Sequence, residues 1–204
     1  MRRWIVRWRC ALLITALFLA GGSAPLRAQQ AGGATALRVY AAFGPGALRP
    51  GVEVTGRVAG ECFAASLADQ SRDDAWRCTS SNRILDPCFE GFQGTQAVMA
   101  CPESPWTSRV TLLTPTKEPA RDSANRANIG GGLPWALELT SGVRCVFLTG
   151  ATALVAGMRI NYGCVGSAQA VVGDVNRVLP EWRVFVDRGQ GVTVESEGVA
   201  VAWY

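Results

Sequence analysis

The carboxylates are the side chains in this sequence with the types and spacing to do chemistry. The stretch at 74–89, DAWRCTSSNRILDPCF, holds two aspartates beside two arginines, two cysteines and a tryptophan. Two carboxyl groups in one cleft can hydrolyse a glycosidic bond, one as the acid and one as the base or nucleophile. Candidates for such a pair are Glu61, Asp73, Asp74, Asp86, Glu90, Asp187, Glu195 and Glu197. Because a domain of this size carries about this many acids, we favour solvated turn residues, caps and arginine partners instead.

Other catalytic groups are scarce. There is no histidine, which excludes Ser-His-Asp and Cys-His catalysis and nearly all catalytic zinc sites. The single lysine, Lys117, lies in the charged stretch TKEPARDSANR, which is typical of a solvated loop and not of a desolvated nucleophile. No phosphate-binding or nucleophile-elbow motif is present. Enzyme activity stays open, but we favour a protein that is not an enzyme, with no catalytic residue, cofactor or metal.

Residues 1–28 have the three parts of a secretory signal peptide. Four arginines precede a short apolar run over 10–20, and small residues follow, with the expected cut after Ala28. An uncleaved anchor is the alternative, although the run is shorter than the about 20 residues that span a bilayer. The sequence therefore predicts a secreted protein or one of the periplasm or cell envelope.

Removing this segment changes the charge of the chain. The full sequence has 20 basic and 16 acidic residues, and five of the basic ones lie in 1–28, so 15 basic residues remain against 16 acidic ones, a net charge of −1. No basic run interleaved with aromatics remains, which argues against a nucleic-acid partner. No second apolar stretch reaches membrane-spanning length, so we expect no stable membrane span after signal removal. An extracytoplasmic protein or a glycan is the expected partner.

Six cysteines remain once Cys10 is removed. An even number in an oxidising compartment indicates disulfides, and no paired-cysteine zinc motif is present. The six are Cys62, Cys78, Cys88, Cys101, Cys145 and Cys164. Folding 144–150 against 158–164 about the loop between them places Cys145 opposite Cys164, within bridging reach. Fifteen pairings are possible; for the other four we choose Cys62–Cys78 and Cys88–Cys101, because those loops are short.

The rest of the chain is typical of β structure. We expect a disordered arm over 29–36, then a single β-rich domain over 37–204 with a polar loop at about 115–133. Alternating or apolar runs bounded by Gly, Pro and Ser predict strands at 51–58 and, after a glycine break, 61–66. Further strands and hairpins are predicted at 97–102, 109–115, 134–150, 158–164, 181–196 and 198–204. Residues 66–96 carry few strand signals and a possible helical turn capped by Ser71. The fold class is therefore all-β, a disulfide-supported antiparallel sandwich or barrel of short strands and hairpins with little helix.

Tryptophans and arginines are the candidate ligand-binding residues. Trp135, Trp182 and Trp203 lie in strand patterns and are expected in the core. The candidates for ligand binding are Trp76, Trp106, Arg77 and Arg83. Trp106, in a predicted turn, is the best placed for exposure. The two arginines could bind an anion, although pairing with Asp73, Asp74 or Asp86 is the favoured alternative.

A series of short motifs carries a family resemblance. The motifs are GECF, DAWRC, NRILDPCF, CPESPW, PWALEL, CVFLTGAT, NYGC and a late WRVF. Over roughly residues 50–204 the sequence resembles a poorly characterised group of secreted bacterial cysteine-containing proteins. The resemblance implies an extracytoplasmic domain with disulfides. That group has no established activity, so the resemblance implies no functional residue.

Three functions are consistent with these observations. The favoured one is a secreted or envelope-associated, non-enzymatic binding domain for a protein, a glycan or a cell-wall component. The first alternative is a carboxylate-dependent hydrolase that works without histidine, which requires two of the candidate acids in one cleft. The second is a structural or assembly module that associates through a free strand edge.

Overall fold

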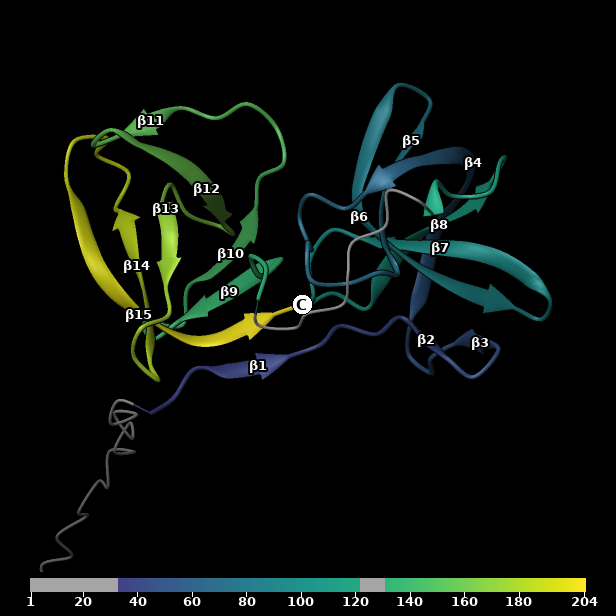
Figure 1. Cartoon of the computed structure of the whole chain (residues 1–204), viewed down its shortest axis with the longest axis horizontal. Coiled ribbons are helices and arrows are strands. Elements are labelled where there is room, and N and C mark those ends of the chain that lie inside the picture. The colour runs from purple at the N-terminus through teal and green to yellow at the C-terminus, as the bar shows by residue number, and fades with distance from the viewer. Residues whose placement is uncertain (1–32, 122–130) are drawn as a thin grey trace, which may run out of the picture.

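The computed structural model describes residues 33–121 and 131–204, and within these ranges the chain forms two closed β-barrels and no helix (Figure 1). This confirms the prediction of an all-β fold supported by disulfides. The predicted signal peptide, residues 29–32 of the predicted arm and residues 122–130 of the predicted polar loop lie outside the described residues.

The first barrel is a five-stranded meander. Its strands are β4 (Glu53–Ala65), β5 (Ala75–Ser80), β6 (Arg83–Gln93), β7 (Gln96–Pro102) and β8 (Arg109–Pro115). Each strand runs antiparallel to the next, so the fifth runs parallel to the first, and β8 closes the barrel on β4. The expected break in β4 is wrong, because the strand continues through Gly60. A Cβ atom there would lie 2.3 Å from the Thr79 carbonyl oxygen, so this close approach of β5 requires glycine.

The second barrel has six antiparallel strands. They are β9 (Ala136–Leu139), β10 (Arg144–Phe147), β12 (Met158–Cys164), β13 (Ala170–Asn176), β14 (Trp182–Asp187) and β15 (Val194–Trp203). The long β15 closes the barrel, because its first half pairs with β14 and its second half with β9. Three short additions are β1 (Ala36–Arg38), parallel to β15, β11 (Leu154–Val155), paired with β12, and the hairpin of β2 (Phe43–Gly44) and β3 (Ala47–Leu48).

The two barrels share a core. Between them, the rings of Tyr40, Phe89 and Trp135 lie with centroids 5.2 to 5.4 Å apart, and all three side chains are buried. Phe89 belongs to β6, whereas Trp135 directly precedes β9, so residues from both barrels meet in one apolar cluster. The sequence predicted one β-rich domain and did not anticipate two barrels, which this cluster joins.

All three predicted disulfide pairings are confirmed. Cys62–Cys78 joins β4 to β5, Cys88–Cys101 joins β6 to β7, and Cys145–Cys164 joins β10 to β12. The register of the last hairpin is also as predicted, with Cys145 opposite Cys164 and Phe147 opposite Tyr162.

Three local expectations are wrong. Residues 66–96, expected to hold few strands, contain β5 and β6, and the unpredicted β13 lies in the second barrel. No helical turn forms near Ser71, whose backbone N–H instead donates to the Asp69 carboxylate in a side-chain-capped turn. Part of the expected disordered arm is ordered, because Thr35 hydrogen-bonds Pro180 and Val199 and residue 36 begins β1.

Candidate functional site

A cleft of about 290 Å³ lies where the two barrels meet, and we call it the inter-barrel cleft. Its lining comes from the first residues of β6, the end of β7, one residue of β8 and the end of β10. These residues are Arg83, Ile84, Leu85, Asp86, Pro87, Cys101, Pro102, Glu103, Thr111, Val146 and Phe147. Clefts between packed units are common ligand sites because walls from two units enclose the ligand.

The cleft exists because β6 and β7 separate. Their ladder pairs residues 89–93 with residues 96–100, and the Cys88–Cys101 disulfide is the last link between them. The next residue of each strand, Pro87 and Pro102, has no backbone N–H and cannot donate to a ladder. The first five residues of β6 therefore form one wall of an opening instead of continuing the barrel surface.

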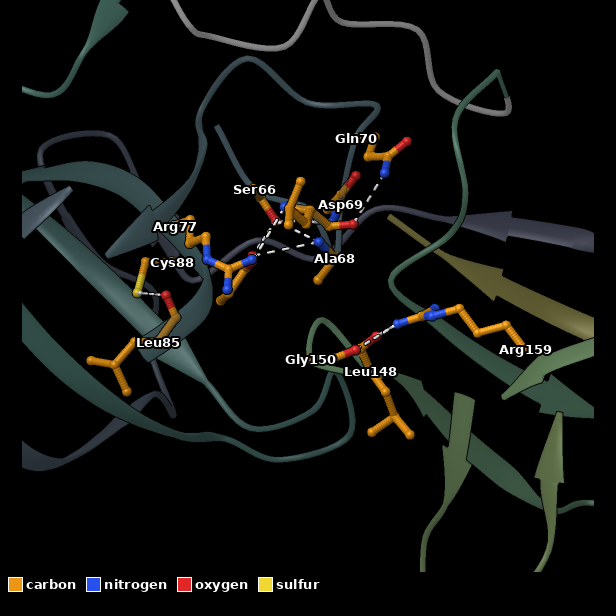
Figure 2. Close-up of polar contacts among 12 residues, drawn as sticks. Ser66, Ala68, Asp69, Gln70, Arg77, Leu85, Cys88, Leu148, Gly150 and Arg159 are labelled. Atoms are coloured by element: carbon orange, nitrogen blue, oxygen red, sulfur yellow. Dashed lines mark hydrogen bonds and ion pairs between the residues drawn. The ribbon is translucent and has the colours of Figure 1, made fainter. Parts of the chain in front are cut away.

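The first-barrel wall is held by Asp86, whose side chain is 1% exposed. The Ser66 hydroxyl donates to its Oδ1 at 2.5 Å, and the N–H groups of Leu67 and Ala68 donate at 3.2 and 3.5 Å (Figure 2). An Arg77 guanidinium nitrogen lies 3.6 Å from Oδ2. Burial raises the pKa of Asp86 and these partners oppose the rise. The carboxylate is fully engaged, so it organises the loop that follows β4.

The second-barrel wall is held by Arg159. Its guanidinium donates to the carbonyl oxygens of Leu148 and Gly150 at 2.9 and 2.8 Å and to the Asn161 side chain. It also lies over the Phe147 ring, 5.8 Å from the centroid. In Figure 2 the loop of Leu148 and Gly150 lies below the loop of Ser66 and Ala68, which Asp86 anchors. Each wall is thus fixed by one charged side chain bonded to backbone groups.

Two charged side chains at the cleft are not engaged in this way. Arg83 and Glu103 are exposed, and neither makes an ion pair or a side-chain hydrogen bond with another described residue. Ile84 beside them is 55% exposed. An arginine, a carboxylate and an apolar side chain therefore remain available to a ligand between two fixed walls.

The structure places the four predicted ligand-binding residues differently. Arg83 lines the cleft. Arg77 pairs with Asp86, which is the alternative that the sequence favoured. The candidacy of Trp76 is wrong, because its side chain is fully buried in the first barrel and donates to Glu90. Trp106 is half-buried.

Trp106 takes part in a hydrogen-bonded cluster that links the two barrels. The indole N–H groups of Trp106 and Trp203 both donate to Glu138 Oε1, at 2.9 and 2.8 Å. Arg144 lies over the Trp106 ring and Arg38 over the Trp203 ring, each 5.3 Å from the centroid. Burial raises the pKa of Glu138, but the two indole donors and the two arginines outweigh it and lower the pKa overall. Trp106 therefore holds the joint, with one ring face covered.

The candidate catalytic acids do not gather in one cleft. Glu61 pairs with Lys117, Asp74 with Arg72, Glu90 with Arg121, and Glu195 and Glu197 with Arg188. Asp187 accepts hydrogen bonds from the turn at 189–191, and Asp73 is exposed. Only Asp86 lines the inter-barrel cleft, so this cleft has no second candidate acid from that set.

One unusual acid was missed by sequence reasoning. Asp69 is 0% exposed, and burial, opposed by the charge of Arg72, raises its pKa from 3.8 to about 6. Its setting, LADQ, has no feature that distinguishes it from a turn residue. The carboxyl is enclosed and accepts the Ser71 N–H at 3.2 Å, so a substrate has no access to it.

Comparisons with known proteins identify no relative: the sequence matches no family model and no curated protein, and the structure matches no solved structure. The structure contains, over 33–121 and 131–204, no helix with the length and apolarity to cross a membrane. The three disulfides are typical of an oxidising compartment.

Proposed function

We propose that this protein is a non-enzymatic binding protein that works outside the cytoplasm, secreted or in the cell envelope, and holds its ligand in the inter-barrel cleft. The observation that carries the proposal is the contrast within the cleft. Its walls are fixed by Asp86 and Arg159, whereas Arg83, Glu103 and Ile84 are exposed and unengaged. Fixed walls with available polar and apolar groups favour binding, because little conformational entropy is lost when a ligand enters.

The location is supported by two independent features. Residues 1–28 have the pattern of a secretory signal. Three disulfides, all between neighbouring strands, are stable in an oxidising environment and rare in the cytosol.

A carboxylate-dependent hydrolase has less support. Its mechanism needs two carboxyl groups about 5 to 10 Å apart around a substrate. Two acids, Asp86 and Glu103, line the cleft, but Asp86 is enclosed by hydrogen bonds and cannot reach a substrate. The acids that the sequence singled out besides Asp86 are paired elsewhere or lie away from the cleft.

The test is a binding panel with a blocked cleft. The exported protein is incubated with insoluble cell-wall material, a glycan array and displayed peptides. We expect one class to bind and Ile84→Glu to weaken that binding at least about tenfold, because a buried, unpaired charge costs more than 1.4 kcal/mol. Phe185→Glu is the matched control, since Phe185 is 45% exposed on the second barrel and outside the cleft. Hydrolysis of a panel member, or equal binding by the Ile84→Glu variant, would contradict the proposal.

A further inference from the structure

The first residues of β6 present an unpaired strand edge to the inter-barrel cleft. β5 and β6 are joined by the two-residue turn of Ser81 and Asn82, whose φ angles are 47° and 62°, as in a type I′ hairpin. In such a hairpin the flanking residues, Ser80 and Arg83, exchange backbone hydrogen bonds. Because the direction of the amides alternates along a regular strand, the N–H and C=O of Ile84, the next residue, point away from β5.

No strand occupies that side of β6. The ladder with β7 begins only at Phe89, so the edge from 83 to 87 has no partner among the described strands. Asp86 supports this assignment. Its side chain is 1% exposed although the residue as a whole is not buried, so the exposed part of Asp86 is its backbone. The N–H and C=O of Ile84 and the exposed backbone of Asp86 thus form an edge that no described strand covers at the cleft.

We propose that an extended peptide segment of another protein binds here by adding a strand to the edge of β6. This inference rests on the proposed function and names its ligand class. Main-chain hydrogen bonds to β6 would supply affinity, and alternate side chains would contact the surface of Val146 and Phe147. Arg83 and Glu103 carry opposite charges without partners, so the segment that complements them bears both an acidic and a basic residue.

The size of the cleft favours a single chain over a folded partner. A volume of about 290 Å³ holds about ten water molecules at liquid density. That space admits one extended segment, whereas a second copy would have to bring a whole barrel wall against β6. Free strand edges are otherwise prone to uncontrolled association, and enclosure between two barrels limits access to slender ligands.

The experiment begins with selection of random peptides of about 12 residues, long enough for one strand, on the exported protein. The tightest peptide is synthesised and its Kd measured. We expect single N-methyl groups to weaken binding at every second position, because one edge of a strand faces β6. Ile84 lies opposite Thr79 in the ladder, but its N–H points away from β5, so Ile84→Pro removes one donor at the free edge and no hydrogen bond to β5. We therefore expect at least about tenfold weaker binding. Ile84→Val keeps the donor and should bind within about twofold of wild type.

Each other outcome is decisive. Equal peptide binding by Ile84→Pro, or N-methyl effects without alternation, would overturn the strand-addition proposal, and the second readout does not depend on the folding of the variant. A glycan or cell-wall ligand displaced by Ile84→Glu, with no peptide selected, would overturn it while leaving the proposed function intact. If sedimentation shows dimers of the wild-type protein and monomers of Ile84→Pro, the edge binds a second copy of this chain and the peptide proposal is wrong. If no class binds in an Ile84→Glu-sensitive manner, the proposed function itself fails.

Discussion

The two barrels solve the problem of a small core in different ways. In the first barrel four of the seven buried members of the core cluster are cysteines, joined in two disulfides around Trp76, Met99 and Leu113. In the second barrel two of twelve are cysteines, and valine, leucine, tyrosine and one alanine fill the rest. In the first barrel, covalent links between strands therefore supply more of the stabilisation than in the second. The barrel with two disulfides is also the one that opens at β6 and β7.

The largest expected effect comes from removing the first barrel's disulfides. Replacing Cys62, Cys78, Cys88 and Cys101 with alanine should lower the free energy of unfolding by about 6 kcal/mol, about 3 for each lost loop constraint. That is comparable to the whole stability of a domain, so the first barrel should unfold. Hydrogen exchange read by mass spectrometry, barrel by barrel, measures this. The control, Cys145→Ala with Cys164→Ala, should cost about 3 kcal/mol; equal losses in the two variants would refute the comparison.

Trp135→Ala tests whether the barrels are coupled. Trp135 packs against Tyr40 and Phe89 in the shared cluster, so its truncation should cost about 4 kcal/mol and reduce exchange protection in both barrels. The half-buried Trp182 packs only against the second-barrel cluster and serves as the control, with a smaller loss confined to that barrel. Protection lost in one barrel alone after Trp135→Ala would show that they unfold independently.

Substituting the charged anchor of each cleft wall should lower the free energy of unfolding by different amounts. Asp86→Ala leaves the Ser66 hydroxyl and Arg77 without their buried carboxylate and should cost about 3 kcal/mol in urea unfolding. Arg159→Ala removes hydrogen bonds at a more exposed site and should cost about 2 kcal/mol. A larger loss for Arg159→Ala would place the more important anchor on the second barrel.

The titrating carboxyl groups of the two barrels should make the free energy of unfolding change with pH in opposite directions. The Asp69 pKa rises from 3.8 to about 6 on folding, so the folded state binds the proton more tightly and stability falls by about 2 kcal/mol as the pH rises from about 4 to about 6. Asp86 acts in the same direction. The lowered pKa of Glu138 has the reverse effect, since its stabilisation is present above its ordinary pKa and lost as the pH falls.

Unfolding of Asp69→Asn between pH 4 and pH 7 measures this effect, with Glu138→Gln as the counterpart. Asp69→Asn should remove most of the fall in stability toward neutral pH. A wild-type stability that rises steadily from pH 4 to pH 6, unchanged by Asp69→Asn, would contradict the assignment.

Local patterns predicted much of this molecule correctly. The all-β class followed from short alternating runs, and the Cys145–Cys164 register followed from the symmetry of one hairpin. Loop length was enough to choose the other two pairings, because those disulfides also join strands that are adjacent in the chain. Each of these features depends on residues close in sequence.

β5 and β6 show where local patterns were insufficient. β5, AWRCTS, alternates apolar and polar residues only over 76–79, where Trp76 and Cys78 are buried and Arg77 and Thr79 partly buried, and this run is too short to stand out among the turn-forming residues around it. It is a strand because its neighbours and the Cys62–Cys78 disulfide hold it within a closed barrel. Closure of the barrel also buries Trp76, and the local sequence does not reveal this burial.

By itself, then, the sequence determined the all-β class, several of the hairpins and the pairing of Cys145 with Cys164, since these depend on propensities and on pairing between near neighbours. Only the tertiary structure decided that there are two barrels, that Trp106 and Trp203 meet on Glu138, and that Arg83 faces the second barrel across a cleft. Those features depend on long-range contacts, such as the parallel closure of β8 on β4 and the separation of β6 from β7. Such contacts arise from the way whole strands pack, and no single stretch of residues encodes them.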